Sequence, residues 1–327
     1  MRGGIDLGGT KIQAVVVNSA GRPVADVRAP TPVDGGPADV ARAMASAIRD
    51  AAAAAGVEPR ALAGVGVGSP GEVDAAAGVV SNVVNLPGWD GGFALGDALA
   101  SDLGVPVAIG NDVQVATNAE ARLGAGKPYS SLLGVFWGSG VGGGIVLNGR
   151  PWVGRGAAAE IGHVVVRRGG ARCPCGRRGC MEAYAGRVAM ELRARQLVAR
   201  GESTVLFELM EARGRDRLTS RIWAMALEQG DPLAERLVER AVKALGAGVA
   251  SAVNLLDVEA VVIGGGLGVR FGEPLVHRIR EAMMPHLFAD DRPPVVAPAT
   301  LGDLGGAIGA ALLVPARGPR LTAQRAG

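Results

Sequence analysis

The chain has 327 residues, a hydrophobic content of 48%, and 34 basic against 31 acidic side chains. This length predicts one large domain or two of medium size with a sizeable core. The near balance of charge gives no support for a nucleic-acid-binding surface, and no run of about 20 apolar residues predicts a membrane span. Because the first motif follows Met1 closely, we expect no signal peptide and a cytoplasmic protein.

The first third of the chain predicts strands followed by alternating helices and strands. Residues 3–17 read as a strand, a glycine turn and a second strand. Residues 38–55 carry apolar side chains at helical spacing until Gly56 ends the pattern. The other elements expected here are strands at 23–29, 62–67 and 105–109, and helices near 93–102 and 112–123.

The second half begins in the same way as the first. An apolar run at 132–137 predicts a strand, a glycine-rich turn follows, and 145–147 predicts the next strand. This order matches residues 3–17 and indicates one architectural unit used twice. The later elements expected are a return strand at 150–153, helices at 182–200, 205–212, 221–229, 232–256, 273–287 and 304–313, and strands at 258–263 and 294–297.

All three cysteines of the chain lie within eight residues, and His163 precedes the first of them by ten positions. One imidazole with three thiolates is the donor set of a closed structural zinc site, and soft thiolates favour zinc over magnesium or calcium. Buried or oxidisable cysteines are the alternative. A disulfide scaffold is not favoured in so long a chain, and the spacing matches iron–sulfur clusters poorly. The four candidate ligands are His163, Cys173, Cys175 and Cys180.

A first glycine-rich turn lies between two predicted strands, at Asp6-Leu7-Gly8-Gly9-Thr10-Lys11. Glycines allow backbone N–H groups to approach phosphate oxygens, while Thr10 adds a hydroxyl and Lys11 a charge. Asp6 could hold Mg²⁺ through water, because that ion prefers oxygen ligands and keeps several waters. The alternative is an ordinary glycine hairpin with a buried Asp.

Two further glycine stretches follow strands in the second half. Gly138-Ser139-Gly140 and the glycines after it formally match a dinucleotide fingerprint, but that pattern requires a helix next and a strand is expected. A Rossmann site is therefore not predicted, and no Walker motif occurs. Gly264-Gly265-Gly266 lies between a strand and a helix, where the base and ribose of a nucleotide could lie against backbone.

Together these motifs resemble the ROK family of sugar kinases and repressors over about residues 3–313. The signature is Glu160-Ile161-Gly162-His163 followed by the cysteine motif from Cys173 to Glu182, with Asn111-Asp112 upstream. The resemblance implies an α/β protein with the actin-like, hexokinase-like ATPase fold, in which two lobes surround a central cleft. The expected lobes are 1–115, to which a helix near 302–314 returns, and 116–301 with the zinc loop; 315–327 is expected to be a disordered tail.

The resemblance also implies a role for each motif residue. Asp112 would be the catalytic base, although an Asp at this point could equally be a helix N-cap. The sugar would contact Asn85, Asn111, Asp112, Glu160, His163 and Glu182, and structural zinc would bind His163 and the three cysteines. ATP and Mg²⁺ would be held by Asp6, Gly8, Gly9, Thr10, Lys11, Gly138, Ser139, Gly140, Gly264, Gly265 and Gly266.

A few positions depart from the family pattern. Ser139 stands where Thr is more common but keeps the hydroxyl, and Gly110 stands where many members have Glu before Asn-Asp. Gln114 and Asn118 also differ from the commoner residues on the following helix. These changes leave the proposed chemistry intact and could reshape the edge of the pocket.

The implied activity is phosphorylation of a hexose by ATP, with glucose as the first choice. N-acetylglucosamine, N-acetylmannosamine, fructose and allose stay open as substrates, and polyphosphate as donor. A repressor of the same family would need a helix-turn-helix before the first phosphate loop, and only five residues precede Asp6. A non-catalytic sugar-binding protein is disfavoured by intact Asp6 and Asp112. We expect a homo-oligomer, a dimer or a tetramer, that binds hexose and ATP but neither nucleic acid nor membrane.

Overall fold

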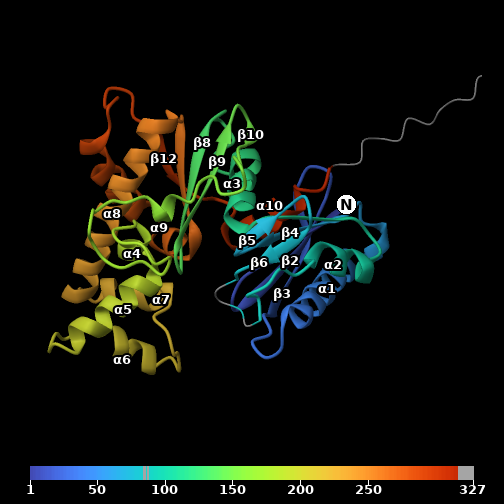
Figure 1. Cartoon of the computed structure of the whole chain (residues 1–327), viewed down its shortest axis with the longest axis horizontal. Helices are drawn as coiled ribbons and strands as arrows, with labels where there is room; N and C mark the ends of the chain where they lie inside the picture. Colours follow the sequence, from blue (N-terminus) through green and yellow to red (C-terminus); the bar gives the residue numbers. More distant parts are fainter. Residues whose placement is uncertain (84–85, 87, 316–327) are drawn as a thin grey trace, which may run out of the picture. The chain divides into compact units, whose positions relative to one another are not determined.

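A computed structural model describes residues 1–83, 86 and 88–315 of the chain. It divides into two compact units: unit 1 comprises Met1–Ala119 with the C-terminal segment from Asp303, and unit 2 comprises Glu120–Gly302. Each contains a five-stranded sheet with helices, so the protein is of the α/β class (Figure 1). The predicted sugar contact Asn85 and nearly all of the predicted tail lie outside the described residues. Within those residues, no helix is both long and apolar enough to cross a bilayer.

The sheet of unit 1 has the strand order β3-β2-β1-β4-β7. Its first three strands form an antiparallel meander, and β4 and β7 continue the sheet parallel to β1. Parallel neighbours end at the same edge, so the turn after β1 and the residues after β7 lie on one edge of this sheet. The strands are β1 (Arg2–Leu7), β2 (Lys11–Val17), β3 (Pro23–Pro30), β4 (Val65–Ser69) and β7 (Val107–Asn111).

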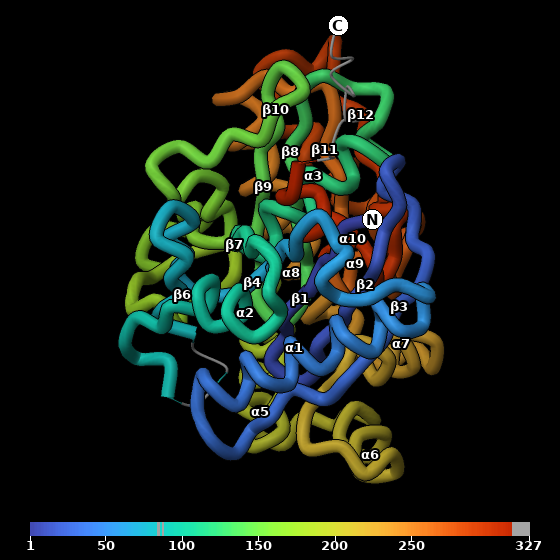
Figure 2. Tube along the Cα trace, turned by 90° about the vertical axis from the view of Figure 1, so that its right-hand side faces the viewer, coloured from blue at the N-terminus to red at the C-terminus, as the bar shows by residue number. Residues whose placement is uncertain are grey.

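Two helices cover opposite faces of this sheet (Figures 1 and 2). A Cβ added to Gly3 would lie 3.0 Å from Ile48 of α1, whereas one added to the next residue, Gly4, would overlap the Ala307 carbonyl of α10. Successive strand residues point to opposite faces, which places α1 and α10 on different sides. The remaining elements of this unit are α1 (Pro37–Ala54), η1 (Pro59–Ala61), a hairpin of β5 (Glu72–Asp74) and β6 (Val79–Ser81), α2 (Leu95–Leu103), α3 (Asp112–Leu123), η4 (Gly302–Leu304) and α10 (Gly305–Ala311). The last turn of α3 and the first residue of η4 belong to unit 2.

The sheet of unit 2 repeats this plan with the strand order β10-β9-β8-β11-β12. Again three strands are antiparallel, and two continue parallel to the first of them. The repeat predicted from the two similar glycine turns is therefore confirmed. The strands are β8 (Leu132–Trp137), β9 (Val141–Leu147), β10 (Arg150–Pro151), β11 (Ala260–Gly264) and β12 (Val295–Pro298).

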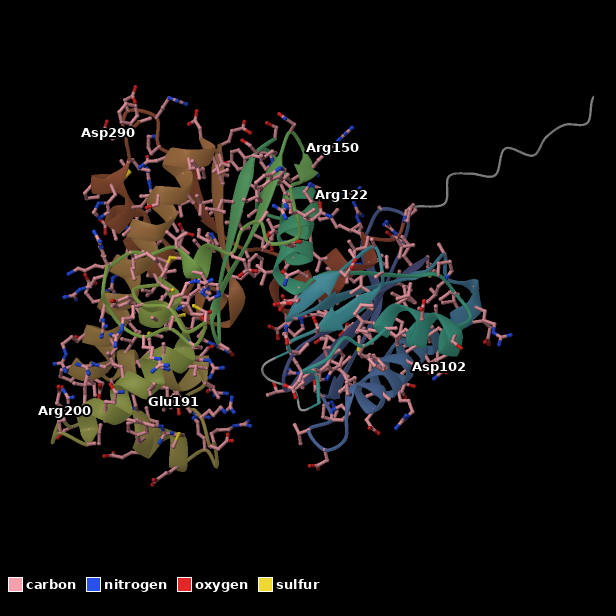
Figure 3. The ribbon with its side chains drawn as sticks, viewed as in Figure 1. Asp102, Arg122, Arg150, Glu191, Arg200 and Asp290 are labelled. Carbon is pink, nitrogen blue, oxygen red and sulfur yellow. The ribbon has the colours of Figure 1, made fainter. Side chains whose placement is uncertain are left out.

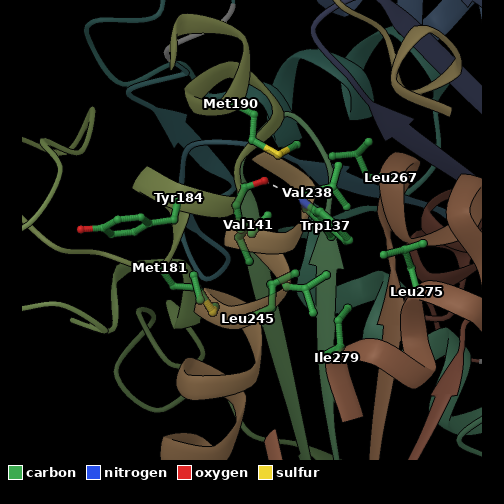
Figure 4. Close-up of a cluster of buried hydrophobic side chains, with 14 of the residues drawn as sticks. Trp137, Val141, Met181, Tyr184, Met190, Val238, Leu245, Leu267, Leu275 and Ile279 are labelled. Atoms are coloured by element: carbon green, nitrogen blue, oxygen red, sulfur yellow. Dashed lines mark hydrogen bonds between the residues drawn. The ribbon is translucent and has the colours of Figure 1, made fainter. Parts of the chain in front are cut away.

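Helices of unit 2 enclose a core around Trp137 and Trp223, both of which are completely buried. Figure 4 shows Trp137 among apolar side chains, with its indole N–H donating to the Ala185 carbonyl at 2.6 Å. This bond ties the end of β8 to α4. The helices are η2 (Ile161–His163), α4 (Glu182–Ala185), α5 (Arg187–Val198), α6 (Leu206–Glu211), α7 (Ser220–Glu228), α8 (Pro232–Leu256), α9 (Gly265–Met283) and η3 (Met284–His286).

Several predicted boundaries were wrong for local reasons. The helix expected at 182–200 is interrupted at Gly186, whose ψ of 133° is extended. The helix expected to begin at 273 begins at Gly265 and bends at Gly272, and Pro274 within it had obscured the pattern. The strand expected at 145–147 begins at Val141, because the intervening glycines pair with β8. The β5–β6 hairpin was not anticipated.

Candidate functional site

The first glycine turn of unit 1 is closed by one backbone hydrogen bond and one hydrogen bond from a side chain. Gly8 N–H donates to the Lys11 carbonyl at 2.9 Å, and the Thr31 hydroxyl donates to the Gly8 carbonyl at 2.7 Å. Lys11 Nζ lies 3.6 Å from the carboxylate of the exposed Asp303. The turn is therefore fixed by its own backbone and by the Thr31 hydroxyl, while Lys11 adds positive charge beside it.

The carboxyl group of Asp6 lies against α10. A Cβ on Gly306 would come within 2.7 Å of the Asp6 carboxyl carbon, so only glycine leaves room for this group. Burial, and then the nearby negative charge of Asp112, raises the pKa of Asp6 to about 7, although Lys11 opposes the shift. A bound cation would restore the ionised form, which fits the predicted role of Asp6 beside Mg²⁺.

Asn111 and Asp112 stand at the same sheet edge as Asp6. In the register of the parallel strands, Asp6 pairs with Gly68 of β4, and Ser69 pairs with Asn111 of β7. The Asn111 side-chain oxygen accepts from two N–H groups in the first turn of α3, both at 3.1 Å, and Asp112 Oδ1 accepts from Val113 N–H at 2.9 Å. Capping of α3 is therefore shared between Asn111 and Asp112 and does not depend on Asp112 alone.

The four predicted metal ligands converge in unit 2. One ligand atom from each of His163, Cys173, Cys175 and Cys180 lies within 4.8 Å of all the others. The Cys175 and Cys180 sulfurs are 3.8 Å apart, and Cys173 Sγ is 3.8 Å from His163 Nδ1. A tetrahedral ion with zinc–sulfur bonds of about 2.3 Å requires sulfur–sulfur distances of about 3.8 Å. The donor set therefore fits zinc both in chemistry and in size.

The cysteine loop brings its thiols together through two tight turns. Gly176 and Gly179 both have φ of 85°, a conformation that glycine adopts readily. Burial raises the pKa of Cys173 to about 12, whereas a backbone N–H from Arg177 lowers that of Cys175 to about 7. Without a cation the three thiols would not ionise together near neutral pH, so this arrangement favours a bound metal.

Glu160 and Glu182 lie next to the thiol cluster. Glu160 is exposed, and its carboxylate is 3.9 Å from His163 Nε2, the ring nitrogen that does not face Cys173. Glu182 reaches two features: one carboxylate oxygen is 3.8 Å from Cys173 Sγ, and the other accepts from Val141 N–H at 2.9 Å. Since Val141 follows Gly140 directly, Glu182 links the metal cluster to the second glycine loop.

Arg187 is a site residue that the sequence did not reveal. Its guanidinium donates to the Ser139 hydroxyl oxygen at 2.7 Å and to the Leu218 carbonyl at 2.7 Å. Its backbone N–H donates to the Gly138 carbonyl at 3.1 Å. Partial burial lowers the pKa of the guanidinium, which nevertheless remains a cation at neutral pH. No short spacing connects Arg187 with a serine 48 positions earlier, so only the packing of α5 shows the pair.

The two predicted nucleotide loops of unit 2, at Gly138–Gly140 and Gly264–Gly266, lie side by side. Strands β8 and β11 are parallel neighbours, with Phe136 paired to Gly264. A Cβ on Gly138 would be 3.8 Å from Gly266 N, and one on Gly265 would approach the Trp137 carbonyl oxygen to 2.6 Å. With φ of 81°, Gly265 is also in a conformation that favours glycine. A strand follows Gly138–Gly140, as predicted, and the start of α9 borders both loops.

Comparisons with known proteins agree with these motifs. A family model described as the ROK family matches residues 2–317. A glucokinase of Thermotoga maritima is 33% identical over 318 residues, covering 96% of this chain and 97% of the relative. A solved ROK hexokinase from Thermus thermophilus is 36% identical with a TM-score of 0.78, covering 96% of this chain and 97% of that one. A ROK family glucokinase from Streptomyces griseus, solved with glucose and AMPPNP, is 32% identical with a TM-score of 0.79, covering 96% and 98%.

Proposed function

Because the chain belongs to the ROK family, we propose that it is an ATP-dependent hexose kinase that converts glucose to glucose 6-phosphate. The near full-length match to a glucokinase solved with glucose and an ATP analogue carries this proposal. The fold is the actin-like, hexokinase-like ATPase fold that the motifs predicted. Fold alone does not imply a function, so each proposed role rests on particular residues.

Asp112 is proposed as the general base. A sugar hydroxyl is weakly acidic, so its proton must pass to a positioned acceptor as the oxygen attacks the γ-phosphorus. The new oxygen–phosphorus bond forms while the bond to the ADP leaving group breaks, and the proton moves to the Asp112 carboxylate. Asp112 stands at the first residue of α3, where the partial positive charge of the helix N-terminus attracts a carboxylate.

The nucleotide is proposed to bind the three glycine loops. In unit 1 these groups are Gly8, Gly9, Thr10 and Lys11, with Asp6 oriented toward Mg²⁺, an ion that neutralises phosphate charge when bound. In unit 2 they are Gly138, Ser139 and Gly140, with Gly264, Gly265 and Gly266 beside the adenosine. Arginine can only donate hydrogen bonds, so the Ser139 oxygen accepts from Arg187 and its own proton is available for a phosphate oxygen.

The sugar is proposed to bind polar groups around the thiol cluster and at Asn111. Glu160, Glu182 and His163 offer hydrogen-bonding groups for hydroxyls, and Asn111 retains its amide nitrogen as a donor because its oxygen caps α3. Asp112 also contacts the reacting hydroxyl in this scheme. Zinc bound by His163, Cys173, Cys175 and Cys180 would be structural, holding the loop that carries Glu182.

A coupled assay over a hexose panel, with ATP and with polyphosphate as donors, tests the function. We expect the highest kcat/KM for glucose with ATP. Faster turnover of an N-acetylhexosamine or of fructose would make that sugar, and not glucose, the assigned substrate of the kinase. Sugar binding by calorimetry without turnover of any hexose would overturn the kinase and support the sugar-sensing alternative. The predicted homo-oligomer can be checked on the same samples by light scattering.

A further inference from the structure

A cavity of unit 2, whose lining includes none of the residues assigned to substrate and metal binding, has a strongly one-sided charge. Its volume is about 590 Å³, and it is lined by residues 167–172, by α4 and α5, and by one residue of α8. Among the described residues, five arginines and no carboxylate contribute to its lining. These arginines are Arg167, Arg168, Arg172, Arg193 and Arg240.

The amino-acid composition of the chain does not account for a lining with positive charges alone. The chain has 34 basic and 31 acidic residues, so charged walls should carry both signs. Another cavity of unit 2, of about 600 Å³, does so: it is lined by Glu235, Arg236, Glu239 and Arg278, and Arg278 pairs with Glu239 at 2.6 Å. Within the described part of the chain, by contrast, none of the five arginines forms an ion pair with a carboxylate.

The wall of the arginine cavity is held in place before any ligand arrives. The Arg240 guanidinium lies 4.6 Å from the centre of the Tyr184 ring, a cation–π contact. The Tyr184 hydroxyl accepts from Ala171 N–H at 2.8 Å, and Figure 4 shows this hydroxyl pointing away from the apolar cluster. Arg178 donates to the Gly170 carbonyl at 3.2 Å. The loop that carries Arg167, Arg168 and Arg172 is thereby fastened to α4 and to the cysteine loop.

We propose that this cavity binds an oligophosphate, a chain of phosphate groups that is either free or carried by a nucleoside. Guanidinium groups form paired hydrogen bonds with phosphate oxygens, and arginine is the side chain best suited to that geometry. Five cations facing one space repel one another, so a ligand with several negative charges is favoured over a single phosphate. The cavity volume is sufficient for a molecule of this size.

Calorimetry with inorganic tripolyphosphate tests the site directly. The titration contains no nucleotide, because the phosphates of an ATP analogue would compete for the same arginines, and the cavity site is recognised by its loss in variants of those arginines. We expect one tripolyphosphate site per chain, weakened at least about 10-fold in the double variant Arg168→Gln with Arg193→Gln, since each loses a charged hydrogen bond. Arg236→Gln, which removes one arginine from the mixed-charge cavity, should leave the affinity unchanged. If the double variant fails to fold, the single variant Arg168→Gln, at an exposed position, is titrated in its place.

The outcomes separate the sources of the phosphate chain. In a separate titration with a non-hydrolysable ATP analogue, binding of a second molecule per chain that the double variant loses would identify a nucleotide as the ligand. Binding of tripolyphosphate without a second ATP would identify free oligophosphate. The absence of any saturable site in the wild-type protein, or an equal loss in Arg236→Gln, would overturn the proposal. Failure of the kinase assay leaves this result intact, because the titration measures binding and not transfer.

Discussion

The two units have the same strand order but differ in the residues at the ends of their parallel strands. In unit 1 this edge carries the glycine turn at Gly8 and Gly9 together with two carboxylates, Asp6 in β1 and Asp112 after β7. At the corresponding edge of unit 2, β8 and β11 run into glycine loops at Gly138 and Gly264. Carboxylates can bind cations or accept protons, whereas glycines expose backbone N–H groups to phosphate. On the proposed function, both edges would bind phosphate through glycines, and only the edge of unit 1 would also bind a cation and accept a proton.

The two edges are also held in different ways. In unit 1 a Cβ on Gly66 would overlap the Ala310 carbonyl, so β4 and α10 meet backbone to backbone. In unit 2 the glycine loop is held by side chains, through Glu182 from the metal cluster and Arg187 from α5. The edge of unit 2 should therefore depend on the metal and on single hydrogen bonds, and substitutions of the residues involved can test this dependence.

The largest effect should come from removing a metal ligand. Cys175→Ala leaves an open ligand set, so we expect well under one zinc per chain and a loss of stability of about 4 kcal/mol, as is typical of losing a structural metal. Elemental analysis and chemical unfolding measure the two quantities. Pro174→Ala, at an exposed neighbour without a ligand atom, is the control. Wild-type protein that is fully active with little zinc would contradict this account of unit 2.

Glu182→Gln should weaken hexose binding more than ATP binding. The amide oxygen of Gln can still accept from Val141 N–H, so the glycine loop is retained, but the charge is lost. We expect the KM for hexose to rise roughly 10- to 150-fold, the equivalent of one charged hydrogen bond. Steady-state kinetics with each substrate varied measure the change, with exposed Glu211→Gln as the control. Equal increases in both KM values would argue against a sugar contact.

Arg187→Met should weaken ATP binding more than hexose binding, the reverse of the effect expected for Glu182→Gln. Without the guanidinium, the Ser139 hydroxyl is no longer oriented and the loop loses one anchor. We expect the KM for ATP to rise about 10-fold, with a smaller change for hexose. Arg200→Met, two residues beyond α5 and labelled in Figure 3, provides a matched control. If Ser139→Ala and Arg187→Met together cost as much as the sum of the single variants, the two side chains do not act as a pair.

A further effect concerns pH and Asp6. Because its folded pKa of about 7 exceeds the ordinary value of 3.8, the folded state holds the proton more tightly. Stability should therefore fall as pH rises between these two values and level off above about 7. Asp6→Asn should remove this part of the slope, as measured by urea unfolding at pH 5 and pH 8 in magnesium-free buffer. An identical pH dependence in both proteins would contradict the shift.

Much of the fold can be predicted from local patterns in the sequence. Glycine turns between apolar runs predicted both repeats, and the helical periodicity of α1 and α8 predicted those helices nearly to their ends. The start of α9 escaped prediction because Gly265, Gly266, Gly268 and Gly272 are poor helix formers when judged alone. Packing of Gly268 against Ile263 shows the tertiary reason for one of these glycines, since its Cβ position is 3.2 Å from that side chain.

The candidate site was predictable where its residues are close in sequence. His163 and the cysteines fall within 18 residues, and the predicted cluster is confirmed as a group of converging ligand atoms. The sequence could not show that Arg187 contacts Ser139 or that Glu182 bridges to Val141, because both contacts depend on how α4 and α5 pack. The arginine cavity was missed for the same reason, since Arg240 is distant in sequence from residues 167–172.

The central claim is that the edge of unit 1 performs the chemistry through Asp112, and Asp112→Asn tests it most directly. The amide keeps the size and the capping ability of the side chain but cannot accept the proton. We predict that kcat falls at least about 100-fold, while hexose affinity measured by calorimetry without ATP changes little. Asp97→Asn, at an exposed position of α2, should behave as wild type. Asp112→Glu is the substitute if the Asn variant unfolds at a much lower temperature. A folded Asp112→Asn enzyme with near-normal kcat would show that Asp112 only caps α3, and would contradict the mechanism.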